Sequence, residues 1–245
     1  MAGSTGERVW DKFLTEQDKA QRAILGEKKR RPYGQRPALL LIDLYRWVFG
    51  DEPEPLLESV KKWPGSCGLA GWEAIPHIQK LLAAARAAGI PVIHTTGAQL
   101  EMVHWANRTE KEEDPELADR ERRKNQLIPE TGPIDGELVI RKSSPSAFWG
   151  TPLIGHLVSH GIDTILVGGE STSGCVRASV VDGCTSRFKM FVVEECVFDR
   201  HEACHAMDLF TMNQKYASVI DVNEAVDYLS RFEDGKDTGV TLTKA

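Results

Sequence analysis

The chain has 245 residues, of which 41% are hydrophobic and 27% charged, and its net charge is −6. This acidic balance excludes the basic surface that nucleic acid binding requires, and no apolar run approaches the ~20 residues that span a bilayer. We therefore expect one large α/β domain without nucleic acid or membrane partners. The first residues lack the basic and apolar segments of a signal peptide, so we expect a cytoplasmic protein.

Residues 1–36 are expected to form an N-terminal helical arm. Trp10 to Leu25 has amphipathic spacing, and a basic link containing proline and glycine follows from Lys28 to Pro37. We expect this arm to pack on a neighbouring subunit. Residues 37–232 are expected to form the main domain, and 233–245 a flexible tail.

The main domain opens with the sequence ALLLIDLY, Ala38 to Tyr45. Its continuous apolar run predicts a strand buried on both faces, with Asp43 at the carboxyl end. Residues 50–71 are rich in proline and glycine and are expected to be irregular. Residues 74–88 then have helical spacing, and Ile90 to Thr96 is the next predicted strand, which completes a βαβ unit.

The stretch from Glu101 to Pro133 is dominated by charge and predicts a solvated loop or an exposed helix without chemistry. Strands and helices alternate again after it. The predicted strands are Glu137–Lys142, Asp163–Gly169, Phe188–Glu194 and Tyr216–Ile220, and the predicted helices are Thr151–His160, the segment after Cys175, His201–Asn213 and Val222–Phe232. The pattern predicts an α/β fold with about six mostly parallel strands and helices on both faces of the sheet.

The most informative segment is GGESTSGCVRASVVDGC, Gly168 to Cys184. It places Cys175 between a predicted strand and a predicted helix. A helix N-terminus lowers the pKa of a cysteine, so we expect Cys175 to be a thiolate and a nucleophile. An inert buried cysteine is the alternative interpretation. The chain has five cysteines without CxxC or Cys/His spacing, so free thiols are the simplest expectation.

Three ionisable residues are predicted at carboxyl ends of parallel strands, where ligands bind: Asp43, Lys142 and Cys175. A carboxylate can accept the thiol proton and later protonate a leaving amine, while an ammonium neutralises charge. Taken singly, each residue has a structural explanation: Asp43 as a cap of the next turn, Lys142 as a surface lysine, and Cys175 as a core thiol.

The sequences IDLY, VIRKSSPSAFWGTPL and ILVGGESTSGCVRASVVDG occur in this order and resemble the isochorismatase-like cysteine hydrolases, particularly the branch of N-carbamoylsarcosine amidase and maleamate amidase. The resemblance extends from about Arg36 to Tyr228 and implies the isochorismatase-like fold. It also implies that Cys175 is the nucleophile, Asp43 the general acid and base, and Lys142 the third member of a catalytic triad.

The same resemblance implies a cis peptide bond between Glu170 and Ser171. It further implies that the backbone amides of Ser171 and Cys175 bind the oxyanion. Arg200, in the sequence VFDRHE, matches the arginine that holds the substrate carboxylate in the carbamoylsarcosine-like enzymes. A structural salt bridge is the competing explanation for this residue.

The chain also departs from the family pattern. Tyr45 stands where many members have glutamine, which leaves the shape of the pocket open. The ligand pattern of metal-containing nicotinamidases is missing from His94 to Trp105, so we expect no metal and no cofactor. Trp105 and Phe148 are candidates for the mouth of the active site.

The resemblance implies an amidohydrolase that cleaves the C–N bond of a small ureido or carboxamide compound and releases ammonia through a thioester. Two alternatives remain: a vinyl-ether hydrolase of the isochorismatase type, and a non-catalytic binding protein with the same fold. The expected partners are a small amide or ureido substrate and further copies of the chain, because family members commonly form oligomers, with a tetramer favoured.

Overall fold

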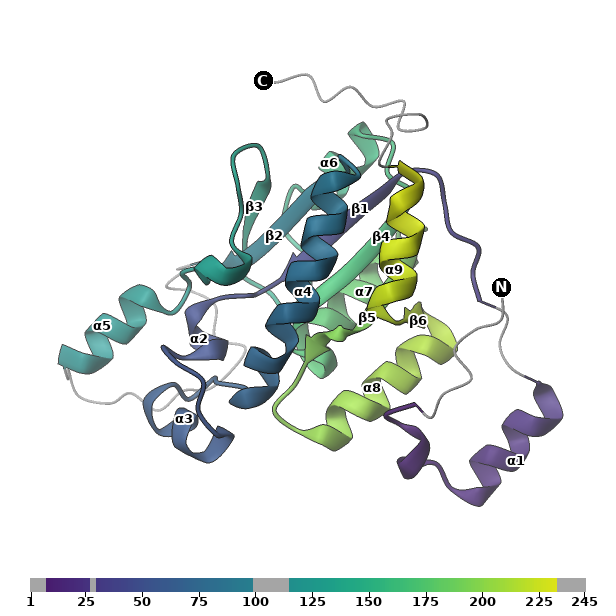
Figure 1. The fold of residues 1–245 in the computed structure, drawn as a ribbon, viewed down its shortest axis with the longest axis horizontal. Helices are drawn as coiled ribbons and strands as arrows, with labels where there is room; N and C mark the ends of the chain where they lie inside the picture. Colours follow the sequence, from purple (N-terminus) through teal and green to yellow (C-terminus); the bar gives the residue numbers. More distant parts are fainter. Residues whose placement is uncertain (1–7, 27–29, 99–114, 233–245) are drawn as a thin grey trace.

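The computed structural model describes residues 8–26, 30–98 and 115–232. Within this part of the chain, a central sheet of six strands in the order β3-β2-β1-β4-β5-β6 is parallel throughout (Figure 1). The strands are β1 (Pro37–Ile42), β2 (Val92–Gly97), β3 (Leu138–Lys142), β4 (Thr164–Glu170), β5 (Lys189–Phe198) and β6 (Ser218–Ile220). The α/β fold predicted from the sequence is therefore confirmed, with a sheet that is wholly rather than mostly parallel.

Helices and short helical turns connect the strands. The α-helices are α1 (Glu16–Leu25), α2 (Arg46–Phe49), α3 (Leu56–Lys62), α4 (Leu69–Ala87), α5 (Pro115–Arg123), α6 (Leu153–Ser159), α7 (Arg177–Thr185), α8 (Glu202–Lys215) and α9 (Val222–Leu229). The shorter turns are η1 (Asp11–Phe13), η2 (Pro129–Thr131), η3 (Thr172–Val176) and η4 (Ser230–Phe232). None of the helices described here is long and apolar enough to cross a membrane.

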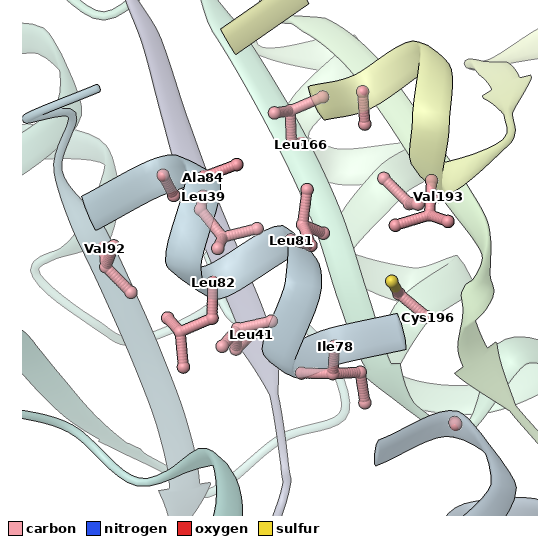
Figure 2. Close-up of a cluster of buried hydrophobic side chains, with 14 of the residues drawn as sticks. Leu39, Leu41, Ile78, Leu81, Leu82, Ala84, Val92, Leu166, Val193 and Cys196 are labelled. Atoms are coloured by element: carbon pink, nitrogen blue, oxygen red, sulfur yellow. The ribbon is translucent and has the colours of Figure 1, made fainter. Parts of the chain in front are cut away.

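Helices cover both faces of the sheet, and strand β1 is accordingly apolar at every position. Leu39 and Leu41 point to the face that α4 and α9 cover, and Figure 2 shows them beneath Leu81 and Leu82 of α4. Ala38, Leu40 and Ile42 point to the opposite face, which α6, α7 and α8 cover. A strand buried on both sides explains why this segment has no polar alternation.

The strand register brings the carboxyl ends of β1, β3 and β4 to one edge. Ile42 pairs with Gly169 of β4, and Gly97 of β2 pairs with Lys142 of β3. The residues that follow β1 and end β3 and β4 therefore lie at the same edge of the sheet, where open α/β folds bind ligands.

The prediction of an irregular stretch over residues 50–71 is wrong, since α3 and the first residues of α4 lie there. Helix α4 begins five residues before the predicted start at Ala74 and contains Pro76. Its first turn is held by packing, because Gly71 lies against the rings of Phe49 and Phe198. Tertiary packing here overrides the local signals of proline and glycine.

The N-terminal helix predicted from Trp10 to Leu25 is divided into η1 and α1. Thr15 starts α1 because its hydroxyl accepts from the amide of Asp18, whose carboxylate accepts from the amide of Thr15 in return. Trp10 is buried against Phe210, whereas α1 has no buried residue and extends away from the sheet (Figure 1). The predicted tail, residues 233–245, lies outside the described residues.

Candidate active site

Asp43 lies directly after β1 and is fully buried, with 0% of its surface exposed. Its backbone adopts φ 55°, a left-handed conformation that aspartate tolerates better than most residues. The Thr95 hydroxyl donates to Asp43 Oδ1 at 2.8 Å, and the Asp43 amide donates to the Thr95 carbonyl at 3.2 Å. These contacts with β2 fix the carboxylate at the edge of the sheet.

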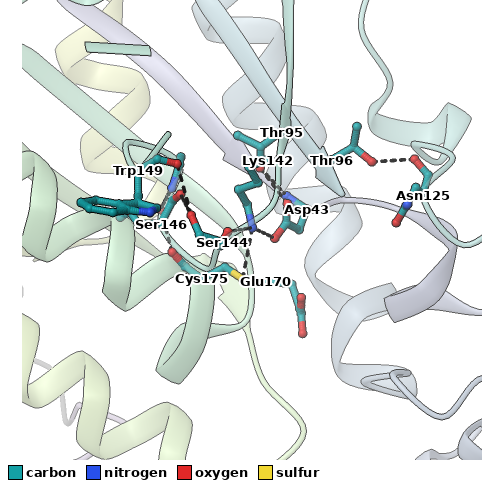
Figure 3. Close-up of polar contacts among 12 residues, drawn as sticks. Asp43, Thr95, Thr96, Asn125, Lys142, Ser144, Ser146, Trp149, Glu170 and Cys175 are labelled. Atoms are coloured by element: carbon teal, nitrogen blue, oxygen red, sulfur yellow. Dashed lines mark hydrogen bonds and ion pairs between the residues drawn. The ribbon is translucent and has the colours of Figure 1, made fainter. Parts of the chain in front are cut away.

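Lys142 connects the other two predicted residues. Its Nζ lies 2.6 Å from Asp43 Oδ2 and donates to Cys175 Sγ at 3.3 Å (Figure 3). The same ammonium donates to the carbonyl of Ser144 at 3.1 Å. Only 7% of Lys142 is exposed, so this lysine is not the surface residue of the alternative interpretation. One buried ammonium thus joins an acid and a thiol.

Cys175 lies in η3, which separates β4 from the start of α7 at Arg177. Gly174 before it has φ −110° and ψ −106°, which breaks the helical geometry of this turn. The Ser179 hydroxyl donates to the Cys175 carbonyl at 2.7 Å and ties the turn to α7. The cysteine is therefore held before the helix rather than within its first turn.

The expected thiolate is not what this environment favours. Burial raises the pKa of Cys175 to about 12, and the carboxylates of Asp43 and Glu170 add to the rise while Lys142 opposes it. The prediction of a lowered pKa for Cys175 is therefore wrong. The helix dipole, on which that prediction was based, lowers the pKa less than desolvation and two nearby acids raise it. Cys175 is therefore a thiol at neutral pH.

Lys142 stays charged in this site. Burial acts to lower the pKa of Lys142, but the Asp43 carboxylate and the hydrogen bonds to Asp43 and Cys175 raise that pKa above the ordinary value. A buried charge needs a partner of opposite sign, and Asp43 provides it.

The peptide bond between Glu170 and Ser171 is cis, at the position that the family resemblance implies. Gly169 before it has φ 116°, and a side chain at this position would collide with the Ile42 carbonyl. The Ser171 carbonyl accepts from the amides of Gly174 at 2.9 Å and Val176 at 3.1 Å, which closes the turn. That the amides of Ser171 and Cys175 bind an oxyanion stays a prediction.

Arg200 lies in the loop between β5 and α8 and is already paired. Its Nη1 lies 2.8 Å from Glu170 Oε1, and its Nη2 donates to the carbonyl of Gly65. Burial acts to lower the pKa of Arg200, but the Glu170 carboxylate raises it. The salt bridge that competed with a substrate role is thus present, and the substrate role stays a prediction.

The two aromatic candidates for the mouth of the site have different outcomes. Trp105 lies outside the described residues. Phe148 does not line the mouth: its ring is buried in the core, 6.0 Å from the ring of Phe188, because it fills the space beside Gly183 of α7. The neighbouring Trp149 is 73% exposed, and its carbonyl accepts from the Ser144 hydroxyl beside Lys142 (Figure 3).

His94, at one end of the segment considered for metal binding, is a core residue. Its Nε2 lies 3.0 Å from Glu137 Oε2, and burial lowers the pKa of its ring. Across residues 8–26, 30–98 and 115–232, no three His, Cys, Asp or Glu side chains are placed to hold a metal ion. The expectation of a metal-free enzyme stays a prediction.

Sequence reasoning missed Thr95 and Cys67, and it named Glu170 for its cis peptide bond but not for the contacts of its side chain. The position of Thr95 near the carboxyl end of β2 and of Glu170 at the end of β4 was a usable signal, since polar residues at this edge face the ligand site. Cys67 Sγ lies 3.8 Å from Glu170 Oε1, a contact between distant segments that no local pattern indicates.

A model of the isochorismatase domain matches residues 37–224. N-carbamoylsarcosine amidase of Arthrobacter sp. is 31% identical over 225 residues, covering 87% of this chain and 78% of that protein. Maleamate amidohydrolase of Pseudomonas putida is 33% identical over 212 residues, covering 82% of this chain and 90% of that protein.

Similarity in three dimensions agrees with these matches. A cysteine hydrolase from Pseudomonas syringae superposes with a TM-score of 0.67, covering 83% of this chain and 97% of that one. Its 19% identity supports a shared fold and nothing finer. The resemblance inferred from the three motifs is confirmed, and the chain belongs to the isochorismatase domain family.

Proposed function

We propose that this protein is a cysteine-dependent amidohydrolase that cleaves the C–N bond of a small ureido or carboxamide compound and releases ammonia through a thioester. The observation that carries the proposal is the position of Lys142 Nζ, 2.6 Å from Asp43 Oδ2 and 3.3 Å from Cys175 Sγ. A base and a nucleophile, both in contact with one fixed positive charge, are the parts that covalent amide hydrolysis requires.

The first half of the reaction begins from the thiol. Cys175 attacks the substrate carbonyl, its proton passes to Asp43, and a C–S bond forms while the carbonyl oxygen becomes an oxyanion. The Lys142 ammonium stabilises sulfur as the thiol loses its proton, and the amides of Ser171 and Cys175 stabilise the oxyanion. The high pKa of Cys175, about 12, requires this coupling of attack to proton transfer, because little free thiolate exists at neutral pH.

The second half regenerates the thiol. The C–N bond breaks as Asp43 gives its proton to the leaving nitrogen, and ammonia departs from the thioester. Water then attacks the thioester carbonyl and gives a proton to Asp43. The C–S bond breaks, the proton returns to Cys175, and the acid product leaves. Asp43 therefore serves as base twice and as acid twice in one turnover.

The enzyme class expected from the sequence, a hydrolase of linear amides, is confirmed by the relatives named above, an amidase and an amidohydrolase. The substrate class is part of the proposal. N-carbamoylsarcosine and maleamate each carry a carboxylate close to the scissile amide. We propose that the substrate of this chain does so too, and that Arg200 binds the carboxylate through its guanidinium.

No specific observation favours the two alternatives from the sequence. A vinyl-ether hydrolase does not use the cysteine, yet Cys175 Sγ here contacts the ammonium that pairs with Asp43. A binding protein without catalysis does not need a buried acid, cation and thiol in contact, which are costly to desolvate.

We also propose that the protein works without a cofactor, in the cytoplasm, and as a homo-oligomer, with a tetramer favoured. Support for an oligomer comes from α1, where Ile24 is 84% and Leu25 76% exposed. An isolated helix of ten residues is marginally stable in water, so contacts with a second copy would stabilise it. Light scattering at micromolar concentration, with Ile24→Asp/Leu25→Asp as the comparison, measures this directly.

Ammonia release from a panel of carboxylated and neutral amides tests the proposed activity. Cys175→Ala and Cys175→Ser are expected to lose turnover while they keep the fold, because neither residue supplies a thiol nucleophile. Cys184→Ala, Cys196→Ala and Cys204→Ala are the matched controls and should keep most of the activity. Full activity in Cys175→Ala would contradict the covalent mechanism.

A further inference from the structure

The last residue of β4, Glu170, is an acid that the proposed chemistry does not use. Only 4% of it is exposed, although a buried carboxylate is costly unless paired. Its Oε1 is the point of contact: Arg200 Nη1 lies 2.8 Å away, and Cys67 Sγ lies 3.8 Å away. The residue directly precedes Ser171, so it lies between the proposed oxyanion site and the proposed carboxylate site.

Arg200 is consequently occupied by partners within the chain. Glu170 takes one end of the guanidinium, and the Gly65 carbonyl takes another nitrogen. A substrate carboxylate that binds Arg200 meets a second carboxylate already bound to the same group. Two like charges on one guanidinium repel each other, so binding is favoured when Glu170 is neutral.

The surroundings of Glu170 allow that change of charge near neutral pH. The groups that face it are Arg200 and Asp199 after β5, Asp43 and Tyr45 after β1, Cys67 before α4, and Cys175 in η3. Burial raises the pKa of Glu170 to about 7. The Arg200 guanidinium opposes this rise, and the carboxylates of Asp43 and Asp199 add to it.

We propose that Glu170 is a specificity-determining residue that competes with the substrate carboxylate for Arg200, so that carboxylated amides bind with uptake of one proton by Glu170. The proposal rests on the proposed function, because it takes Arg200 as the site of the substrate carboxylate. It adds that the preference for carboxylated over neutral substrates falls as the pH rises. With Glu170 protonated, the guanidinium of Arg200 is free to form charge-assisted hydrogen bonds to the ligand.

The test measures binding separately from turnover, in the Cys175→Ala protein by calorimetry. The probes are N-carbamoylsarcosine and its neutral primary amide, which differ only in the carboxylate. With a Glu170 pKa of about 7, the Kd of the carboxylated probe should rise about ten-fold from pH 6 to pH 8, and that of the neutral amide should stay constant. Repeating the titration in buffers of different ionisation enthalpy should reveal the uptake of close to one proton at pH 8.

Glu170→Gln identifies the titrating group. In this background the Kd of the carboxylated probe should lose its pH dependence and stay at the value measured at pH 6. Glu202→Gln, which removes an exposed carboxylate from the first turn of α8, is the matched control and should keep the ten-fold change. If Glu170→Gln fails to fold, the proton uptake and the contrast between the two probes in Cys175→Ala still decide the question.

Three results would overturn the inference. The first is a pH-independent Kd for the carboxylated probe, and the second is a pH dependence that persists in Glu170→Gln. The third is the absence of binding by the carboxylated probe at pH 6 and pH 8. Ammonia release by the unmodified protein is measured in parallel, so release from neutral amides together with any of these results leaves the amidohydrolase in place and removes only the role of Glu170.

Discussion

Two neighbouring groups at the carboxyl edge of the sheet have the same composition, an acid, a cation and a thiol. In the first, which we call the lysine group, Lys142 contacts both Asp43 and Cys175. In the second, the arginine group, Glu170 contacts both Arg200 and Cys67. The central residue is the cation in one group and the acid in the other.

This difference in the order of contacts determines what each thiol can do. Burial raises the pKa of both Cys175 and Cys67, but Cys175 contacts an ammonium that stabilises its thiolate during attack. Cys67 contacts a carboxylate, which opposes ionisation further. The lysine group is therefore suited to covalent chemistry and the arginine group to binding, although their residue types match.

Removing the acid of the lysine group should have the largest effect. Asp43→Asn is expected to lower kcat by roughly 10²–10⁴-fold, because the general base and acid is lost. It should also destabilise the protein by about 3–5 kcal/mol, since Lys142 is left as an unpaired buried charge. Steady-state ammonia release and thermal unfolding measure the two effects separately.

The double variant Asp43→Asn/Lys142→Met is the control for that loss of stability. It removes the unpaired charge and should recover much of the stability without recovering activity. Recovery of activity in the double variant would mean that Asp43→Asn loses activity through the unpaired charge of Lys142 and not through the loss of a base.

The two thiols should differ in alkylation by iodoacetamide. With a pKa of about 12 for Cys175, its rate should rise about a hundred-fold between pH 7 and pH 9 without a plateau, because the thiolate fraction rises ten-fold per pH unit. Cys67 is buried beside Glu170 and should not react in the folded protein. Peptide mapping distinguishes alkylation of Cys175 from alkylation of the exposed Cys204. A plateau for Cys175 below pH 8 would restore the lowered pKa expected from the sequence.

Arg200→Lys tests the binding role of the arginine group. Lysine keeps the charge but loses the planar fork that holds a carboxylate through two hydrogen bonds. We expect KM to rise roughly ten-fold for carboxylated substrates, which corresponds to ~1.4 kcal/mol, with much less change for neutral amides. Equal losses for both kinds of substrate would assign Arg200 a structural role only.

The smallest expected effect is that of chelation. Activity should survive prolonged treatment with EDTA and dialysis, because neither group uses a metal in the proposed chemistry. The measurement is ammonia release before and after treatment, with zinc or iron added back. A loss of activity that either metal restores would place a metal in the site and would require another role for Lys142.

The sequence was sufficient to predict the sheet and the members of the lysine group. Continuous apolar runs such as the one before Asp43 define buried parallel strands, and residues at the ends of such strands gather at one edge. This rule for the carboxyl ends of parallel strands predicted that Asp43, Lys142 and Cys175 lie near one another, although it gave no distances. Motif order then identified the family.

The sequence was not sufficient where tertiary packing sets the outcome. The pKa of Cys175 depends on burial and on Glu170, and the helix dipole alone suggested the opposite direction. The ring of Phe148 enters the core because of the space beside Gly183, which no local pattern reports. The partners of Arg200 come from β4 and from the loop before α4, so only the fold brings them together.

The central claim is that Cys175 forms a covalent intermediate, and peptide mass spectrometry of the acid-quenched protein tests it most directly. The protein is mixed with an amide that it hydrolyses, quenched in acid during turnover and then digested. The account predicts an added mass equal to the acyl group on the peptide that contains Cys175, absent from Cys175→Ala and from peptides that contain Cys67. An acyl group on another residue, or steady turnover by Cys175→Ala, would contradict the account.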